Sequence, residues 1–335
     1  MATEKIKRKI VWIFGAGASR GAGAFSSVQH GGKIAIPMQA DFWETTLRFS
    51  TGKDRKTIEA FLFRYFKGYK KTPPKVLPSQ RRTYFADVSV EEVFTFLSER
   101  ISTPTISPQL KTYFKEEVWE ALIRSVAATF KRFSCNTETA AVYKDFRLNH
   151  LRTRDSIISF NYDTVLESSL RKTKWYYYCM KKKKVPIFKP HGSINWDTKA
   201  DKSIKVSTTC NSPIIVAPTH LKFIGLTGME EGQTSGYLNS NKAIGAIWQA
   251  MEKQMDEAKA IVFIGYSFPD ADLYFSSVLR TVLTKSTSQI KIILVNPDSL
   301  RISDKISYRF AIDKSNIQNH FDIKSFCKLY RDDIV

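Results

Sequence analysis

Residues 11–19 of the chain read Val-Trp-Ile-Phe-Gly-Ala-Gly-Ala-Ser, an apolar run that leads directly into a glycine-rich turn ending in serine. Glycine permits positive φ angles and close approach of a ligand, and a helix that starts at the turn adds partial positive charge. The pattern therefore predicts a strand followed by a turn that can bind a diphosphate. The G-x-G-x-S spacing lacks the third glycine of the dinucleotide-binding fingerprint, and small residues after a buried strand also serve tight packing. Both interpretations stay open from this stretch alone.

Further apolar runs along the chain predict a parallel sheet. Short, nearly continuous apolar segments are typical of strands that are covered on both faces. Helical patterns separate these runs, as expected for a Rossmann-like α/β fold. The predicted strands are 10–14, 156–160, 186–189, 214–217, 260–264 and 290–295, and the predicted helices between them include 163–171, 241–259 and 271–284.

About 140 residues between the first two predicted strands have a different character. They carry helical apolar spacing, interrupted by Pro-rich breaks. We interpret them as a large helical module inserted into the sheet domain. The predicted domains are therefore a Rossmann-like domain formed by 8–40 and 150–335 and a helical insertion at 41–149, with helices at 41–48, 56–69, 90–100, 110–133 and 139–148.

Composition limits the class of protein. A chain of 335 residues can bury a full core. It has no apolar stretch of about 18 residues, and its N-terminal apolar run is too short for a secretory signal, so we expect no membrane span and a cytoplasmic location. Its four cysteines, at 135, 179, 210 and 327, are scattered, and its histidines have no metal-ligand spacing. This indicates reduced thiols and argues against a zinc site.

The formal net charge of +20 is the unusual bulk property. A positive field attracts anionic partners such as nucleic acid, an acidic protein or a phosphorylated small molecule. The densest basic segment is 171–189, which contains four consecutive lysines at 181–184. A solvated lysine loop beside an edge strand is the favoured explanation of this segment, because solvated charge runs are common and lysine protects sheet edges. Nucleic acid therefore stays a candidate partner.

Polar residues follow four more of the predicted strands. Asn161 and Asp163 follow the second strand, where an amide can hold a sugar hydroxyl or a water and an aspartate can cap a helix. His191 follows the third strand and can accept a proton near neutral pH, with Gly192 beside it leaving room for a ligand. The last two strands are followed by Gly265 and Ser267, and by Asn296 and Asp298. Each residue alone also fits a turn or a cap.

Taken in order, these motifs resemble those of sirtuin-like proteins. The motifs are Gly15-Ala16-Gly17-Ala18-Ser19, Phe160-Asn161-Tyr162-Asp163, His191-Gly192-Ser193, Gly265-Tyr266-Ser267 and Asn296-Pro297-Asp298. The chain is most similar to bacterial sirtuin-like NAD-degrading effectors of anti-phage defence. That resemblance implies a Rossmann-like NAD-binding domain with a helical module.

The resemblance also implies roles for individual residues. Asn161 would position the nicotinamide ribose or the attacking water, and His191 would act as the base. The glycine-rich turn would hold the diphosphate, and Ser267 and Asn296 would contact the adenosine half. The full predicted set of NAD-binding residues is Gly15, Ala16, Gly17, Ser19, Asp163, Gly265, Ser267, Asn296 and Asp298.

The chain departs from protein-deacylating sirtuins, which carry four zinc-binding cysteines and a Gly-Ile-Pro-Asp-Phe-Arg stretch. It has no such cysteine set, and only Ile36-Pro37 echoes the stretch. We therefore expect a zinc-free NAD glycohydrolase that takes NAD as its substrate and yields nicotinamide and ADP-ribose. Two alternatives stay open: a non-catalytic NAD or ADP-ribose sensor, and a DNA-associated subunit of a defence complex.

The resemblance further implies partners. Such chains work in assemblies with a second subunit, often a HerA-like ATPase or an Argonaute-type protein. We expect a homo-oligomer whose trigger lies on another protein. The helical insertion is the expected cover of the active site and assembly surface, because lids commonly close over such clefts.

Overall fold

The apolar runs form the middle of a parallel sheet. The computed structural model describes residues 9–27, 32–69, 76–77, 80–133, 135–170, 175–178, 184–199, 203–207, 210, 213–216, 241–286 and 290–333. Within these residues the main sheet has seven strands in the order β13-β12-β11-β1-β4-β6-β5, and all neighbouring strands are parallel. The predicted Rossmann-like fold is confirmed. Its five central strands are β1 (Ile10–Phe14), β4 (Ser156–Ser159), β6 (Val185–Phe188), β11 (Ala260–Ile264) and β12 (Lys291–Val295).

The sheet edges differ from the prediction. Two edge strands, β5 (Trp175–Tyr177) and β13 (Ile317–His320), are not predicted. β13 has no continuous apolar run, and β5 is aromatic but lies within the segment 171–189, which was interpreted as a basic segment. The predicted strand at 214–217 is not part of the main sheet. Its described residues form β10 (Ile214–Ile215), which pairs antiparallel with β7 (Gly192–Ser193). Two short hairpins complete the strands: β2 (Phe25–Ser27) with β3 (Lys33–Ala35), and β8 (Trp196–Thr198) with β9 (Ile204–Val206).

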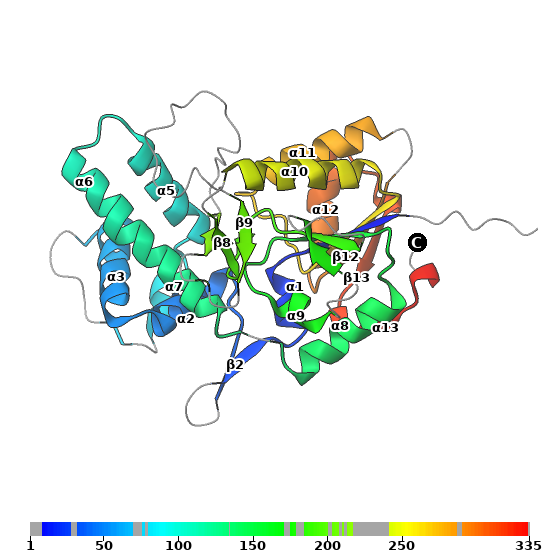
Figure 1. Cartoon of the computed structure of the whole chain (residues 1–335), viewed down its shortest axis with the longest axis horizontal. Coiled ribbons are helices and arrows are strands. Elements are labelled where there is room, and N and C mark those ends of the chain that lie inside the picture. The colour runs from blue at the N-terminus through cyan, green and yellow to red at the C-terminus, as the bar shows by residue number, and fades with distance from the viewer. Residues whose placement is uncertain are drawn as a thin grey trace, which may run out of the picture.

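Helices cover both faces of the sheet (Figure 1). One layer contains α10 (Asn241–Asp256), α11 (Leu273–Lys285) and α12 (Ser299–Phe310). The other contains α1 (Ala16–Gly21), α8 (Thr137–Asn149), α9 (Val165–Ser169) and α13 (Ile323–Lys328). Short 3₁₀ turns lie at Gln39–Asp41, Lys314–Asn316 and Arg331–Asp333. None of the described helices is long and apolar enough to cross a membrane.

The remaining helices form a separate group on the left of Figure 1. They are α2 (Phe42–Phe49), α3 (Gly52–Phe66), α4 (Arg81–Phe85), α5 (Val90–Ser102), α6 (Pro108–Thr112) and α7 (Glu120–Phe130). A π-helical stretch at Tyr113–Trp119 joins the last two, so the predicted helix at 110–133 is one segment with a wider turn in its middle. Aromatic rings fill this group: Phe61 lies 5.9 Å from Phe96 and 6.2 Å from Phe114 between ring centroids.

Helix α8 does not pack with this helical group, although the predicted insertion at 41–149 includes it. Its Phe146 ring lies 5.1 Å from Trp12 and 5.4 Å from Phe14, both in the central strand β1. The Asn149 amide donates to the backbone oxygen of Cys327 at 2.9 Å. The helix therefore packs against β1 and contacts α13. The predicted boundary rested on helical spacing, which does not show against what a helix packs.

Candidate functional site

The glycine-rich turn after β1 packs backbone to backbone against the loop after β11. The Gly15 N–H donates to the oxygen of Ile264 at 3.0 Å, and the Gly17 N–H donates to the oxygen of Gly265 at 3.0 Å. A Cβ added to Gly15 would lie 2.6 Å from the Gly265 oxygen. Gly265 has φ +61°, and a Cβ there would lie 2.0 Å from the Ala18 nitrogen. This close contact alone requires glycine at these positions.

The hydrogen bonds of the turn bear on the expected diphosphate. The N–H groups of Gly15 and Gly17 donate within the protein, and the Ala18 N–H donates to the Gly15 oxygen at 2.9 Å. Ala16, between them, is exposed. Diphosphate binding by this turn stays a prediction, and those three donors already have protein acceptors.

Asn161 joins the end of β4 to the glycine-rich turn. Its amide nitrogen Nδ2 lies 3.0 Å from the Gly15 oxygen and 3.3 Å from Ser19 Oγ. Ser19 Oγ in turn lies 3.2 Å from both carboxylate oxygens of Asp163. These side chains are buried, so the contacts fix the plane of the Asn161 amide. Its oxygen accepts no hydrogen bond from the described residues and is the atom that can contact a ligand.

Asp163 is part of a buried polar cluster behind the strand end. It accepts a hydrogen bond from the Val165 N–H at 2.9 Å, two residues further on, which is an Asx turn; the N-cap of α9 is Thr164, so Asp163 lies one residue before the cap position expected for it. Burial raises the pKa of its carboxyl group, and the nearby Lys189 opposes that shift. The Lys189 ammonium donates to the Asp163 backbone oxygen at 2.6 Å and to Glu167 Oε1 at 2.7 Å. Lys189 is fully buried and forms an ion pair with Glu167, which was not predicted from the sequence.

His191 lies beside Asn161. Its ring centroid is 4.9 Å from Phe160 and 6.4 Å from Tyr162, the two residues that flank Asn161 in sequence. Gly192 has φ +80°, and a Cβ there would lie 2.1 Å from the Ile214 oxygen. Gly192 therefore leaves room for β10, and not for a ligand as expected. His191 therefore packs against the two sequence neighbours of Asn161, and the catalytic roles of both residues stay predictions.

A carboxylate that the sequence analysis did not single out faces His191. Asp272 Oδ1 lies 4.0 Å from His191 Nε2, and the Tyr266 hydroxyl donates to Asp272 Oδ2 at 2.5 Å. Both Asp272 and Tyr266 are buried. The sequence held a signal for Asp272, because this residue follows a predicted strand and lies at the start of a predicted helix, as Asp163 does.

The outer predicted residues have contacts of their own. Asn296 accepts a hydrogen bond from the Asp298 N–H at 3.0 Å through its side-chain oxygen, and Asp298 lies 3.4 Å from Arg301 on the surface. Ser267 is exposed. Within the described part of the chain, no contact joins these three residues to Asn161 or His191. Their roles in binding the adenosine half stay predictions.

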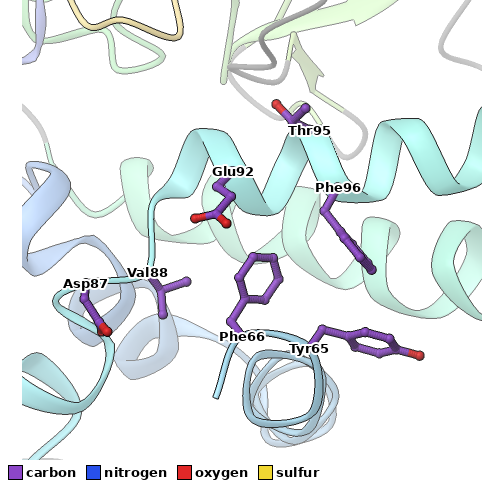
Figure 2. Close-up of a pocket in the computed structure, with 7 residues that line it drawn as sticks. All are labelled: Tyr65, Phe66, Asp87, Val88, Glu92, Thr95 and Phe96. Carbon is purple, nitrogen blue, oxygen red and sulfur yellow. The ribbon is translucent and has the colours of Figure 1, made fainter. Parts of the chain in front are cut away.

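Two cavities lie away from this edge of the sheet. One, of about 430 Å³, lies between α3 and α5 in the helical group, where Phe66 and Phe96 line it (Figure 2). The other, of about 790 Å³, lies at the amino ends of β4 and β6 and is lined by Arg147, Arg152 and Arg154. Among the described residues, no group of three or more His, Cys, Asp or Glu side chains gathers as a metal site. Cys179 lies outside those residues.

Comparison with known proteins finds a family match over part of the chain. The family described as SIR2-like domain matches residues 155–318, a segment that contains Asn161, His191 and Asp272 but not the glycine-rich turn. Over this segment the chain is sirtuin-like, and its sheet is Rossmann-like. No curated protein matches the sequence significantly.

The solved structures that match the chain include the following two. One is a mutant Sir2 homologue in complex with 2'-O-acetyl ADP ribose, with 13% identity, a TM-score of 0.38, and coverage of 96% of this chain and 89% of that one. The other was described for the mechanism and regulation of Sir2 enzymes, with 11% identity, a TM-score of 0.32, and coverage of 96% and 90%.

Proposed function

We propose that the protein is an NAD glycohydrolase, which cleaves NAD with one water to nicotinamide, ADP-ribose and a proton. One observation carries the proposal: Asn161 and His191 follow neighbouring strands of a SIR2-like domain, and the His191 ring contacts both residues that flank Asn161. An amide and an imidazole at the carboxyl edge of a parallel sheet are suited to hold a sugar and to accept a proton.

The chemistry requires little beyond these groups. Nicotinamide in NAD is cationic and leaves as a neutral molecule when the N-glycosidic bond breaks, so the transition state resembles an oxocarbenium ion. The enzyme lowers the barrier by stabilising that transition state more than the substrate. In this proposal the Asn161 amide oxygen, whose plane is fixed by the contacts to Gly15 and Ser19, orients the ribose or the water. His191 accepts the proton that the water loses as it bonds to the ribose.

We further propose that the reaction depletes NAD in anti-phage defence, within a homo-oligomer controlled by a second subunit such as a HerA-like ATPase or an Argonaute-type protein. The order of the sirtuin-like motifs supports this part. The net charge of +20 suits docking to an acidic partner or to nucleic acid.

The test is nicotinamide release from NAD by the full-length chain, measured by chromatography with and without DNA. We expect His191→Ala to lose about 10²–10⁴ of the rate, as for removal of a general base. Asn161→Ala should also lose turnover while retaining some NAD binding. The matched control is His320→Ala, at the end of the edge strand β13, which should keep the wild-type rate.

Two outcomes would contradict the proposal. A folded His191→Ala protein with the wild-type rate would exclude His191 as the base. Calorimetric NAD binding by the wild-type chain without nicotinamide release in any condition would favour the non-catalytic sensor.

A further inference from the structure

We propose that Asp272, held by Tyr266, positions the His191 imidazole and selects its Nε2–H tautomer. The catalytic consequence rests on the proposed function, whereas the tautomer is a property of the resting protein. Tyr266 and Asp272 both lie in the loop between β11 and α11. In the sheet, β11 is separated by β1 and β4 from β6, the strand that precedes His191. The loop between them therefore extends across the carboxyl edge of the sheet.

The two oxygens of the Asp272 carboxylate face different groups. Oδ2 accepts the Tyr266 hydroxyl at 2.5 Å, and Oδ1 lies 4.0 Å from His191 Nε2. Burial, together with the negative charge of Asp272, raises the pKa of the Tyr266 phenol well above its ordinary value. Tyr266 therefore stays a donor at neutral pH, and Asp272 is the acceptor of that bond. The hydroxyl fixes which oxygen points to His191.

Aromatic rings restrict the imidazole on its other sides. Phe160 lies 4.9 Å from it at 62°, and Trp248 lies 6.4 Å away, both measured between ring centroids. The titratable groups that face His191 in the described residues are Asp272 and the phenol of Tyr162, whose hydroxyl donates to the Val216 oxygen at 2.7 Å. Asp272 is thus a carboxyl group at the ring's Nε2 edge.

The loop that carries Asp272 is itself held in place. Phe268 has φ +52°, a left-handed conformation that is uncommon for a phenylalanine. Its buried ring lies 4.6 Å from Phe263, and its oxygen accepts the Lys305 ammonium at 2.8 Å. These contacts fix the turn that brings Asp272 towards the site.

A carboxylate opposite Nε2 favours the proton on that nitrogen, because a carboxylate can only accept. The lone pair is then on Nδ1, where the ring can take a proton. The 4.0 Å separation is longer than a hydrogen bond, but an opposite charge at that distance stabilises the imidazolium that forms. Asp272 touches no reacting atom in this scheme and acts through His191.

Asp272→Asn gives a sharp test because it replaces one hydrogen-bond acceptor of the side chain by a donor with little change in shape. The Tyr266 hydroxyl needs an acceptor, and the only acceptor of an asparagine side chain is its oxygen. The amide NH₂ group then faces His191 Nε2, which must become the acceptor. We expect the imidazole to switch to the Nδ1–H tautomer. With the wrong tautomer, kcat for nicotinamide release should fall by about 10²–10⁴, and KM for NAD should change little.

The experiment uses the full chain labelled with ¹⁵N-histidine. Nitrogen shifts report the tautomer, and the His191→Ala spectrum assigns the signal among the five histidines. The matched control is Asp270→Asn, which removes the same charge from an exposed aspartate of the same loop that pairs with Lys305 at 2.9 Å. It should keep the wild-type tautomer and rate.

A wild-type His191 in the Nδ1–H form would overturn the proposal, and so would an Asp272→Asn protein with unchanged tautomer and rate. The wild-type spectrum needs no variant, so it decides the matter even where Asp272→Asn does not fold. Absence of NAD cleavage by the wild-type chain would refute the proposed function, and the tautomer measurement would still stand by itself.

Discussion

Gly265→Ala separates the two interpretations of the glycine-rich turn. If the glycines are required by backbone packing, the substitution should unfold the turn and lower the free energy of unfolding. If they are required by a ligand, stability should persist and NAD binding should be lost. The structure favours the first outcome, because a Cβ added to Gly265 would meet backbone atoms of Gly17 and Ala18.

Two costs add up at Gly265. Its φ of +61° is left-handed, which costs a residue with a Cβ about 1–2 kcal/mol. The Cβ would also lie 2.0 Å from the Ala18 nitrogen and 2.3 Å from the Gly17 carbonyl carbon, both backbone atoms that cannot rotate away. Overpacking of this kind costs about 1–3 kcal/mol or more. The expected loss is roughly 2–5 kcal/mol, a large share of the ~5–15 kcal/mol by which most domains are stable.

Two other glycines serve as matched controls. Gly68 has φ +74° but nothing within 4 Å of an added Cβ, so Gly68→Ala should cost only the strain of about 1–2 kcal/mol. Gly52 begins α3 with neither strain nor a close neighbour, and Gly52→Ala should be neutral or slightly stabilising.

Urea unfolding of the full chain, followed by circular dichroism, gives the three differences, and calorimetry gives NAD binding. The reasoning is refuted if Gly265→Ala loses no more stability than Gly68→Ala. A stable Gly265→Ala protein that no longer binds NAD would restore the ligand interpretation.

Two further predictions concern the side of the sheet away from the site. Arg331 donates to both oxygens of the buried Asp155, at 2.5 and 2.9 Å, so Arg331→Met should lose about 3–5 kcal/mol of stability, and a loss below about 1 kcal/mol would contradict this. Arg301→Met is its control, because Arg301 is 82% exposed and its pair with Asp298 should be worth at most about 0.5 kcal/mol. Burial lowers the pKa of His150 from 6.5 to about 4. Between those values the unfolded chain binds the proton and the folded chain does not, so the free energy of unfolding should fall by up to about 3 kcal/mol as pH drops from about 6.5 to about 4. His150→Phe should flatten that slope in urea titrations at several pH values, and an unaltered slope would assign it to other groups.

The central strands could be predicted because strands that are buried on both faces appear in the sequence as continuous apolar runs. The segment Ile10–Phe14 is buried at every position, and so is Ala260–Ile264. The edges could not be predicted in this way. In β13 only Ile317 is buried, and its other residues are partly exposed, so the segment has no apolar run. The run at 214–217 resembled a sheet strand, yet its partner is the two-residue strand β7, and a local pattern does not specify a partner.

The site was predictable where it depends on strand ends and not where it depends on loops. Parallel strands bring their carboxyl ends to one edge, so the sequence could place Asn161 and His191 after the ends of the neighbouring strands β4 and β6. Asp272 reaches His191 because the loop after β11 extends past two other strands, and no local signal encodes that course. Likewise, the glycine at position 15 is explained only by Gly265, its neighbour in space.

The buried ion pair between Lys189 and Glu167 links the segments that follow the ends of two neighbouring strands. Lys189 lies two residues before His191, and its ammonium bonds to the Asp163 backbone oxygen, two residues after Asn161. The same ammonium pairs with Glu167, so the cation is held at 2.7 Å in a fully buried position. Burying such a pair is expensive, and replacing it with apolar side chains is often neutral or stabilising. Its position gives a reason for the cost: one side chain fixes the end of β4 relative to the end of β6. The Lys189 contact therefore joins the segment that carries Asn161 to the segment that carries His191, the two residues that we propose to be catalytic.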